Sequence, residues 1–187
     1  MRKSLLFVWA CMGLVCLMSA CKTSVKSKEW KLVWVEDFDQ KNSFDESVWT
    51  KIPRGTSDWN NYMSYYDSCY AMQDGNLILR GIANHTQKND TAPYLIGGVY
   101  TKGKKLFTGG RVEVCARLQA AKGAWPAIWM LPEKAEWPKG GEIDIMERLN
   151  HDHIAYQTTH SYYTHILGIK DNPPHGGINK INLEEYN

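Results

Sequence analysis

The chain has 187 residues, of which 43% are hydrophobic and 22% are charged. This composition is typical of one ordinary globular domain and excludes disordered and collagen-like chains. The formal net charge is +2. Because no run of like charges or basic stripe accompanies it, we expect no nucleic-acid partner.

The first residues are typical of an export signal. Basic residues precede an apolar run over 5–18, which is too short for a comfortable membrane span and ends in small residues. Its end, LMSAC over 17–21, resembles the bacterial lipobox, in which the cysteine is lipidated. We therefore predict a signal over 1–20, lipidation of Cys21 and a polar tether over 21–28, with plain secretion as the alternative.

A lipid on Cys21 would place the protein at a bacterial cell envelope. The lipid would be its only membrane contact, and the domain would be held at the outer membrane, facing either the periplasm or the outside. The remaining residues, 29–187, are predicted to form one domain.

From residue 30 onward the chain is a succession of short apolar or alternating runs separated by turn residues, without sustained helical periodicity. Asp74-Gly75 is a hairpin-type turn. These signals predict an all-β fold of two packed antiparallel sheets. The expected strands include Trp30–Val35, Asn76–Arg80, Gly97–Thr101 and Arg111–Leu118.

The run 111–118 alternates most cleanly, and strand geometry sends alternate side chains to opposite faces. The residues predicted to face a core are Val112, Val114, Ala116 and Leu118.

Two cysteines remain beyond the predicted lipidation site, Cys69 and Cys115. In an oxidising compartment they could form a disulfide, but the sequence does not show whether their Cα atoms approach closely enough. Two unpaired thiols are the equal alternative.

The segment GGEIDIME over 140–147 places three acids among apolar and β-branched residues. On a helix, Glu142 would point away from both other acids, because each residue turns the chain by about 100°. On a regular strand, Glu142 and Asp144 share a face, but the period of two sends Glu147 to the opposite face.

One β-bulge around Ile145-Met146 would return Glu147 to the acidic face, and bulges are common beside active sites. It would leave Ile143 and Ile145 pointing into the core. We therefore predict a bulged strand with all three acids on one face.

Three like charges on one face repel one another, and retaining glycoside hydrolysis uses such repulsion. One carboxylate attacks the anomeric carbon, while a nearby anion helps the other keep the proton needed by the leaving oxygen. The alternatives are ordinary surface acids and a carboxylate metal site.

Tryptophans precede the acids in GAWPAIWMLP over 123–132 and in the following Trp137-Pro138. Indole faces stack on the apolar faces of sugar rings, so Trp129 and Trp125 are candidate sugar contacts. Packing in the core is the alternative for both. Trp137 is expected at the rim of the site or in a loop.

Together, GAWPAIWMLP and GGEIDIME resemble glycoside hydrolase family 16, which includes laminarinases, lichenases, agarases and carrageenases. The acids fit the bulged E-x-D-x-x-E form of that motif. The resemblance continues through VWVEDFD (33–39), DWNNYMSYY (58–66), GGRVEVCAR (109–117) and TTHSYY (158–163).

The resemblance implies a jelly-roll β-sandwich of the concanavalin A-like kind over 29–187. It implies that Glu142 is the nucleophile, that Asp144 supports it by hydrogen bonding, and that Glu147 is the acid and later the base. The residues it places at the substrate are Asn61, Arg111, Trp129 and His160. Each has a structural alternative: Asn61 could cap a turn, Arg111 could pair with Glu113, and His160 could be structural.

Two features depart from the family pattern. Cys115 stands where relatives often carry arginine, and the chain stops at Asn187 where relatives continue through further strands. We therefore expect the C-terminal strands of the domain to be missing.

The expected function is retaining endo-hydrolysis of a β-glucan with 1,3 linkages, either laminarin-like or mixed β-1,3/1,4. The alternatives are hydrolysis of β-galactose linkages in algal galactans or O-glycans, a lectin-like binding lipoprotein, and an inactive remnant. No nucleotide or redox cofactor is expected, because no Gly-rich phosphate loop is present. The resemblance allows a structural calcium ion, and we expect a monomer.

Overall fold

The computed structural model describes residues 29–40, 42–119 and 121–187. The chain divides into two units, one ending at Glu36 and one spanning Asp37–Asn187. The signal, Cys21 and the tether lie outside the described residues. None of the helices in the described part is long and apolar enough to cross a membrane.

In the first unit, the described residues 29–36 form no helix or strand. The predicted strand at Trp30–Val35 is therefore wrong. An apolar run becomes a strand only where a neighbouring strand pairs with its backbone groups, and none of the ladders among the described strands includes these residues.

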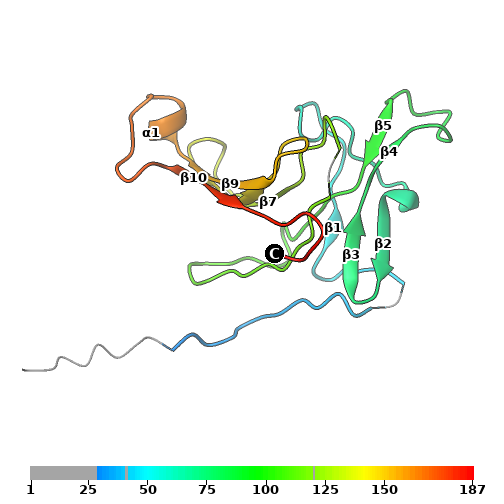
Figure 1. Ribbon diagram of the computed structural model, residues 1–187, viewed down its shortest axis with the longest axis horizontal. Helices are drawn as coiled ribbons and strands as arrows, with labels where there is room; N and C mark the ends of the chain where they lie inside the picture. Colours follow the sequence, from blue (N-terminus) through cyan, green and yellow to red (C-terminus); the bar gives the residue numbers. More distant parts are fainter. Residues whose placement is uncertain (1–28, 41, 120) are drawn as a thin grey trace, which may run out of the picture. The chain divides into compact units, whose positions relative to one another are not determined.

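The regular secondary structure of the second unit is almost entirely antiparallel β-strand, which confirms the predicted all-β class (Figure 1). One 3₁₀ turn, η1 (Asp67–Cys69), and one α-helical turn, α1 (Tyr162–His165), accompany the described strands. The strands are β1 (Thr50–Lys51), β2 (Tyr70–Gln73), β3 (Asn76–Leu79), β4 (Gly81–Ala83), β5 (Tyr94–Ile96), β6 (Val99–Tyr100), β7 (Ala127–Met130), β8 (Glu142–Glu147), β9 (Ile154–His160) and β10 (Gly176–Lys180).

Four strands form the largest sheet, in the order β10-β9-β8-β7, and every neighbouring pair is antiparallel. The other pairs are β1–β6, β2–β3 and β4–β5. Figure 1 labels β10, β9 and β7 of this sheet, with α1 beyond the end of β9.

The predicted hairpin is confirmed in β2–β3. Its turn residues, Asp74 and Gly75, have φ values of 52° and 69°. A two-residue turn with positive φ at both positions matches the twist of the flanking strands, and Asp-Gly adopts it readily. The ladder from Tyr70↔Leu79 to Gln73↔Asn76 closes directly on this turn.

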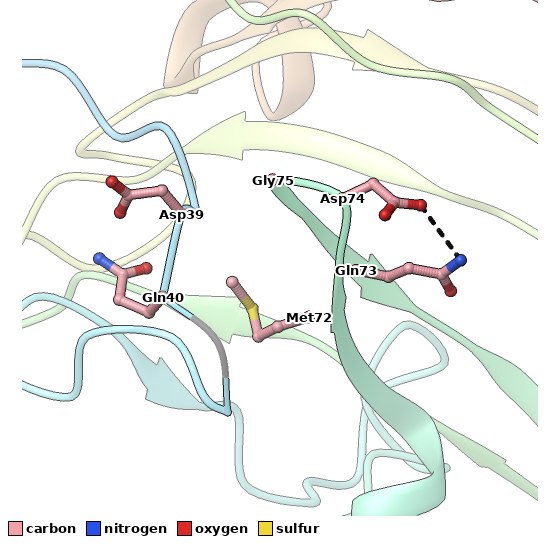
Figure 2. A pocket seen from close by; sticks show the side chains of 6 residues that line it. All are labelled: Asp39, Gln40, Met72, Gln73, Asp74 and Gly75. Carbon is pink, nitrogen blue, oxygen red and sulfur yellow. Dashed lines mark hydrogen bonds between the residues drawn. The ribbon is translucent and has the colours of Figure 1, made fainter.

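A shallow hollow lies beside that turn, between the hairpin and residues 39–40 (Figure 2). The Asp74 carboxylate accepts a hydrogen bond from Gln73 Nε2 at 3.3 Å. None of the residues predicted to take part in function lines this hollow.

The predicted strand over 111–118 is wrong, because this segment has no regular secondary structure. Among the described residues it has one backbone pairing, between Ala116 and Asn187, whose N–H and C=O groups exchange hydrogen bonds of 2.9 and 3.2 Å. Val112 is 47% exposed. Even so, Val114, Ala116 and Leu118 line an apolar groove together with residues of β8. The alternation therefore predicted correctly that these three side chains face apolar surface, although the segment forms no strand.

The buried residues form two groups. One lies near the β2–β3 and β4–β5 pairs and includes Leu95 and Cys69, both 0% exposed. The other lies behind β8 and β9 and includes Met146 and Ala155. Cys69 and Cys115 are unpaired thiols, which is one of the two alternatives that the sequence left open. Cys69 is buried and Cys115 is exposed.

Candidate active site

A β-bulge in β8 brings the three acids to one face of the four-stranded sheet. Against β9, Asp144 pairs with Thr158 and Glu147 pairs with Tyr156, so three steps on β8 match two on its partner. The predicted bulge is confirmed. Because directly opposed residues of antiparallel strands share a face, Glu142, Asp144 and Glu147 all project to the same side.

The same register identifies the neighbours of the acids. Glu142 lies opposite His160 on β9, and Asp144 lies opposite Trp129 on β7. Two residues that the family resemblance placed at the substrate therefore share the acidic face.

The other face of β8 differs from prediction at one residue. Met146 is buried and Ile145 is half-buried over the apolar groove, but Ile143 is 50% exposed. The expectation that Ile143 lies in a core is wrong. The apolar residues that line the groove lie beneath Ile145 and Met146, and Ile143 is not among the lining residues.

The two glycines before β8 fix how the chain enters this strand. A side chain on Gly140 would overlap Pro132 and come within 2.6 Å of Ala135 Cβ. Gly141 has φ of +80°, which favours glycine. These glycines fold the loop back on itself and set the start of β8 at Glu142.

Asp144 is the most buried of the three acids, with 5% of its surface exposed. Burial, followed by repulsion from Glu147 and Glu142, raises the pKa of Asp144 from 3.8 to about 6, although His160 opposes this rise. His160 Nε2 lies 3.2 Å from Asp144 Oδ2, close enough for an ion pair when protonated. That oxygen is not aligned for a hydrogen bond with any group in the described residues.

Each glutamate accepts a hydrogen bond from a different tryptophan. Trp137 Nε1 donates to Glu142 Oε2 at 2.6 Å, and Trp125 Nε1 donates to Glu147 Oε1 at 2.8 Å. An indole N–H can only donate, so each bond fixes the orientation of the carboxyl group that accepts it. Both rings remain 47% exposed, which leaves apolar ring surface open beside the acids.

Trp129 is half-buried and packs edge-on against Trp59, with ring centroids 5.0 Å apart and an interplanar angle of 77°. Trp59 was not singled out from the sequence. Its position inside DWNNYMSYY, one of the segments of family resemblance, was the available signal.

The two remaining predicted substrate contacts, Asn61 and Arg111, have different surroundings in the structure. Asn61 is half-buried, and its Oδ1 is fully enclosed without a hydrogen-bond partner in the described chain. A buried amide oxygen of this kind carries a desolvation cost unless something pairs with it. Arg111 instead forms an ion pair with Glu113, and both side chains are largely exposed. This ion pair was one alternative for Arg111, and its contact with substrate stays a prediction.

A second histidine joins the site from α1. The ring of His165 lies 4.4 Å from that of Trp137 and 6.1 Å from that of His160, centroid to centroid. Sequence reasoning missed His165, because it falls just beyond TTHSYY and follows no spacing that links it to the acids.

Within the described residues, no group of three or more His, Cys, Asp or Glu side chains is arranged to hold a metal ion. The three acids of β8 therefore gain no support as a metal site. The described part of the chain contains no such ligand set for the calcium ion that the family resemblance allows.

Comparisons with known proteins agree with this geometry. Residues 99–173, which include β7, β8 and most of the acidic face, match the family model described as the XgeA-like catalytic domain of glycoside hydrolase family 16. The chain belongs to glycoside hydrolase family 16.

Two curated relatives extend the family match. The chain is 42% identical over 144 residues to the keratan-sulfate endo-1,4-beta-galactosidase of Sphingobacterium multivorum, which covers 74% of this chain and 34% of that protein. It is 34% identical over 163 residues to a beta-glucanase of Rhodothermus marinus, which covers 82% of this chain and 56% of that protein. The chain thus spans between a third and just over half of these relatives.

A solved family 16 structure confirms the predicted fold. The crystal structure of SCLam, a non-specific endo-beta-1,3(4)-glucanase, superposes with a TM-score of 0.71 at 26% identity. The match covers 86% of this chain and 63% of the glucanase. The antiparallel strands described above are therefore part of a jelly-roll family 16 fold.

Proposed function

We propose that this family 16 chain hydrolyses internal bonds of a β-linked polysaccharide with retention of anomeric configuration. The observation that carries the proposal is the bulge in β8, which puts Glu142, Asp144 and Glu147 on one sheet face. Binding alone needs sugar-stacking surface and hydrogen bonds, whereas three adjacent carboxylates are costly without a chemical use.

In the proposed reaction, the Glu142 carboxylate attacks the anomeric carbon while Glu147 donates its proton to the leaving oxygen. The glycosidic bond breaks and a glycosyl ester forms on Glu142. Glu147, now ionised, then takes a proton from water, which attacks the ester and releases the sugar with its original configuration. Retaining enzymes need the two carboxyl groups roughly 5 Å apart, and inclination of the two side chains across the bulged face would satisfy this requirement.

Asp144 has a supporting role in this proposal. Its negative charge lies between the two glutamates and disfavours simultaneous ionisation of all three acids. At a pH near 6, Asp144 can itself hold a proton and donate a hydrogen bond to a neighbouring carboxylate. His160, opposite Glu142 and near Asp144, would balance part of the charge on this face.

The proposed substrate is a β-glucan with 1,3 linkages, of the laminarin or mixed-linkage type. The names of the Rhodothermus beta-glucanase and of the endo-beta-1,3(4)-glucanase SCLam support this substrate class. Sugar rings would stack on the exposed indole surface of Trp125 and Trp137. Trp129 and Asn61 are the other proposed contacts.

A second substrate class has its own support. The keratan-sulfate endo-1,4-beta-galactosidase is 42% identical to this chain, compared with 34% for the beta-glucanase. A β-galactose polymer, such as keratan-type or algal galactan, therefore belongs in the same assay.

The test is release of reducing ends from laminarin, mixed-linkage glucan, keratan sulfate and agarose by residues 22–187. Glu142→Gln removes the proposed nucleophile, and Glu133→Gln, an exposed glutamate in the loop before β8, is the matched control. Oligosaccharides from one polymer with wild type and Glu133→Gln, but not with Glu142→Gln, would support the proposal and name the substrate. Polymer binding without release by all three folded proteins would instead support a carbohydrate-binding role.

We also propose that the protein is a monomer held by a lipid on Cys21 at the bacterial envelope. The lipobox-like LMSAC supports the anchor. Replacing Cys21 with alanine should move the protein from the membrane fraction to the soluble fraction of expressing cells. Unchanged membrane association would contradict lipid anchoring.

A further inference from the structure

His165 lies outside the acidic strand but packs against the residue that holds Glu142. We propose that His165 is a positioning residue for Glu142 and that it acts through Trp137. This inference rests on the proposed catalytic role of Glu142. The chain of contacts has two steps: the His165 ring against the Trp137 ring, and the Trp137 N–H on the Glu142 carboxylate.

The first step is a close aromatic contact. The rings of His165 and Trp137 lie 4.4 Å apart at 64°, an edge-on arrangement that aromatic pairs favour. Trp137 is exposed on its loop and its N–H is committed to Glu142. A large, half-exposed ring of this kind needs a neighbour to hold one rotamer.

The turn that carries His165 is fixed independently of the substrate. α1 begins immediately after β9, and Ser161 caps it: its hydroxyl accepts from Thr164 N, while the Thr164 hydroxyl accepts from Ser161 N. His165 N donates to Ser161 O at 2.9 Å. Since His160 ends β9 opposite Glu142, the capped turn ties the position of His165 to the acidic face.

The second step determines the direction of the Glu142 carboxylate. The 2.6 Å bond from Trp137 Nε1 occupies Oε2 and leaves Oε1 to approach the anomeric carbon. If Trp137 rotates, Glu142 loses this donor and its carboxylate samples other rotamers. The expected cost of removing His165 is therefore in turnover and not in substrate affinity, because His165 itself need not touch the sugar.

The test compares His165→Ala, which removes the ring, with His165→Phe, which restores an aromatic ring without the imidazole nitrogens. Each variant is examined by its kcat and KM on whichever of laminarin, mixed-linkage glucan, keratan sulfate or agarose the wild type cleaves, and by the indole ¹H–¹⁵N resonance of Trp137, assigned through Trp137→Phe. His151→Ala, on an exposed turn away from Trp137, is the control. His165 is exposed, so these changes should leave the fold intact.

We expect His165→Ala to lower kcat roughly three- to tenfold with little change in KM, the size of one aromatic pair. The Trp137 resonance should move upfield as its hydrogen bond weakens. His165→Phe should recover both values, and His151→Ala should change neither. An unmoved Trp137 resonance in His165→Ala, or no recovery in His165→Phe, would overturn the inference. If wild type cleaves no polysaccharide while the resonance responds as expected, the proposed function fails but the contact chain stands.

Discussion

Replacing Asp144 with asparagine should stabilise the protein at neutral pH while impairing its proposed reaction. Asp144 is 5% exposed, and burial and the neighbouring glutamates raise its pKa from 3.8 to about 6. Below about pH 4, both the folded and unfolded chains hold the proton, so the side chain carries no charge to destabilise the fold. As the pH rises to about 6, the unfolded chain loses its proton first, so the folded state becomes progressively less stable.

The rise from 3.8 to about 6 corresponds to about 3 kcal/mol of lost stability above pH 6. An asparagine side chain at this position keeps the shape of the aspartate and carries no charge. Asp144→Asn should therefore recover up to about that amount at about pH 7.5 and little at about pH 4. The assay is urea unfolding of both proteins at each pH. Asp74→Asn, in the exposed β2–β3 turn, is the matched control for the removal of one carboxylate. A pH-independent effect of Asp144→Asn would refute the reasoning.

Three further changes test other parts of the account. Deleting Ile145 should remove the bulge and return Glu147 to the opposite face, abolishing cleavage in a chain whose circular dichroism remains β-rich; retained cleavage would contradict the role of the bulge. Trp125→Phe should lower kcat/KM about tenfold, because Glu147 loses the hydrogen-bond donor that orients its carboxyl group; equal kinetics for both proteins would show that the indole N–H is dispensable. Gly140→Ala should lower the free energy of unfolding, measured in urea, by about 1–3 kcal/mol, because the added methyl group meets Pro132 and Ala135. The control is Gly177→Ala, on the exposed β10 with open space around it, which should cost much less.

The bulge in β8 could be predicted because the period of a strand allows few solutions. If Glu142, Asp144 and Glu147 act together, only an extra residue between the second and third acid can align them. The hairpin at Asp74-Gly75 was equally accessible, since its turn residues determine the backbone locally. Both predictions depend on neighbours in the sequence.

Predictions that depend on distant partners were less successful. The alternation over 111–118 correctly predicted which side chains face apolar surface, but a ladder also needs a neighbouring strand, and this segment pairs with Asn187 at only one position. The exposure of Ile143 has the same origin, since burial depends on what another part of the chain places over the residue.

The site was predictable in its acids but not in the partners of those acids. Trp125 was a candidate sugar contact and Trp137 was expected at the rim of the site or in a loop. The structure adds that their N–H groups donate to Glu147 and Glu142. His165 could not be predicted, because its contact with Trp137 depends on how the turn after β9 folds back. The ion pair between Arg111 and Glu113, in contrast, was one of the two alternatives that the sequence left open.

The most direct test of the account is to trap the covalent intermediate. A 2-deoxy-2-fluoro glycoside with an activated leaving group slows hydrolysis of the glycosyl ester, so the labelled peptide can be located by mass spectrometry after proteolysis. We expect one sugar on Glu142, absent in Glu142→Gln. A label on Asp144 or Glu147, or cleavage that gives the inverted anomer without any label, would contradict it.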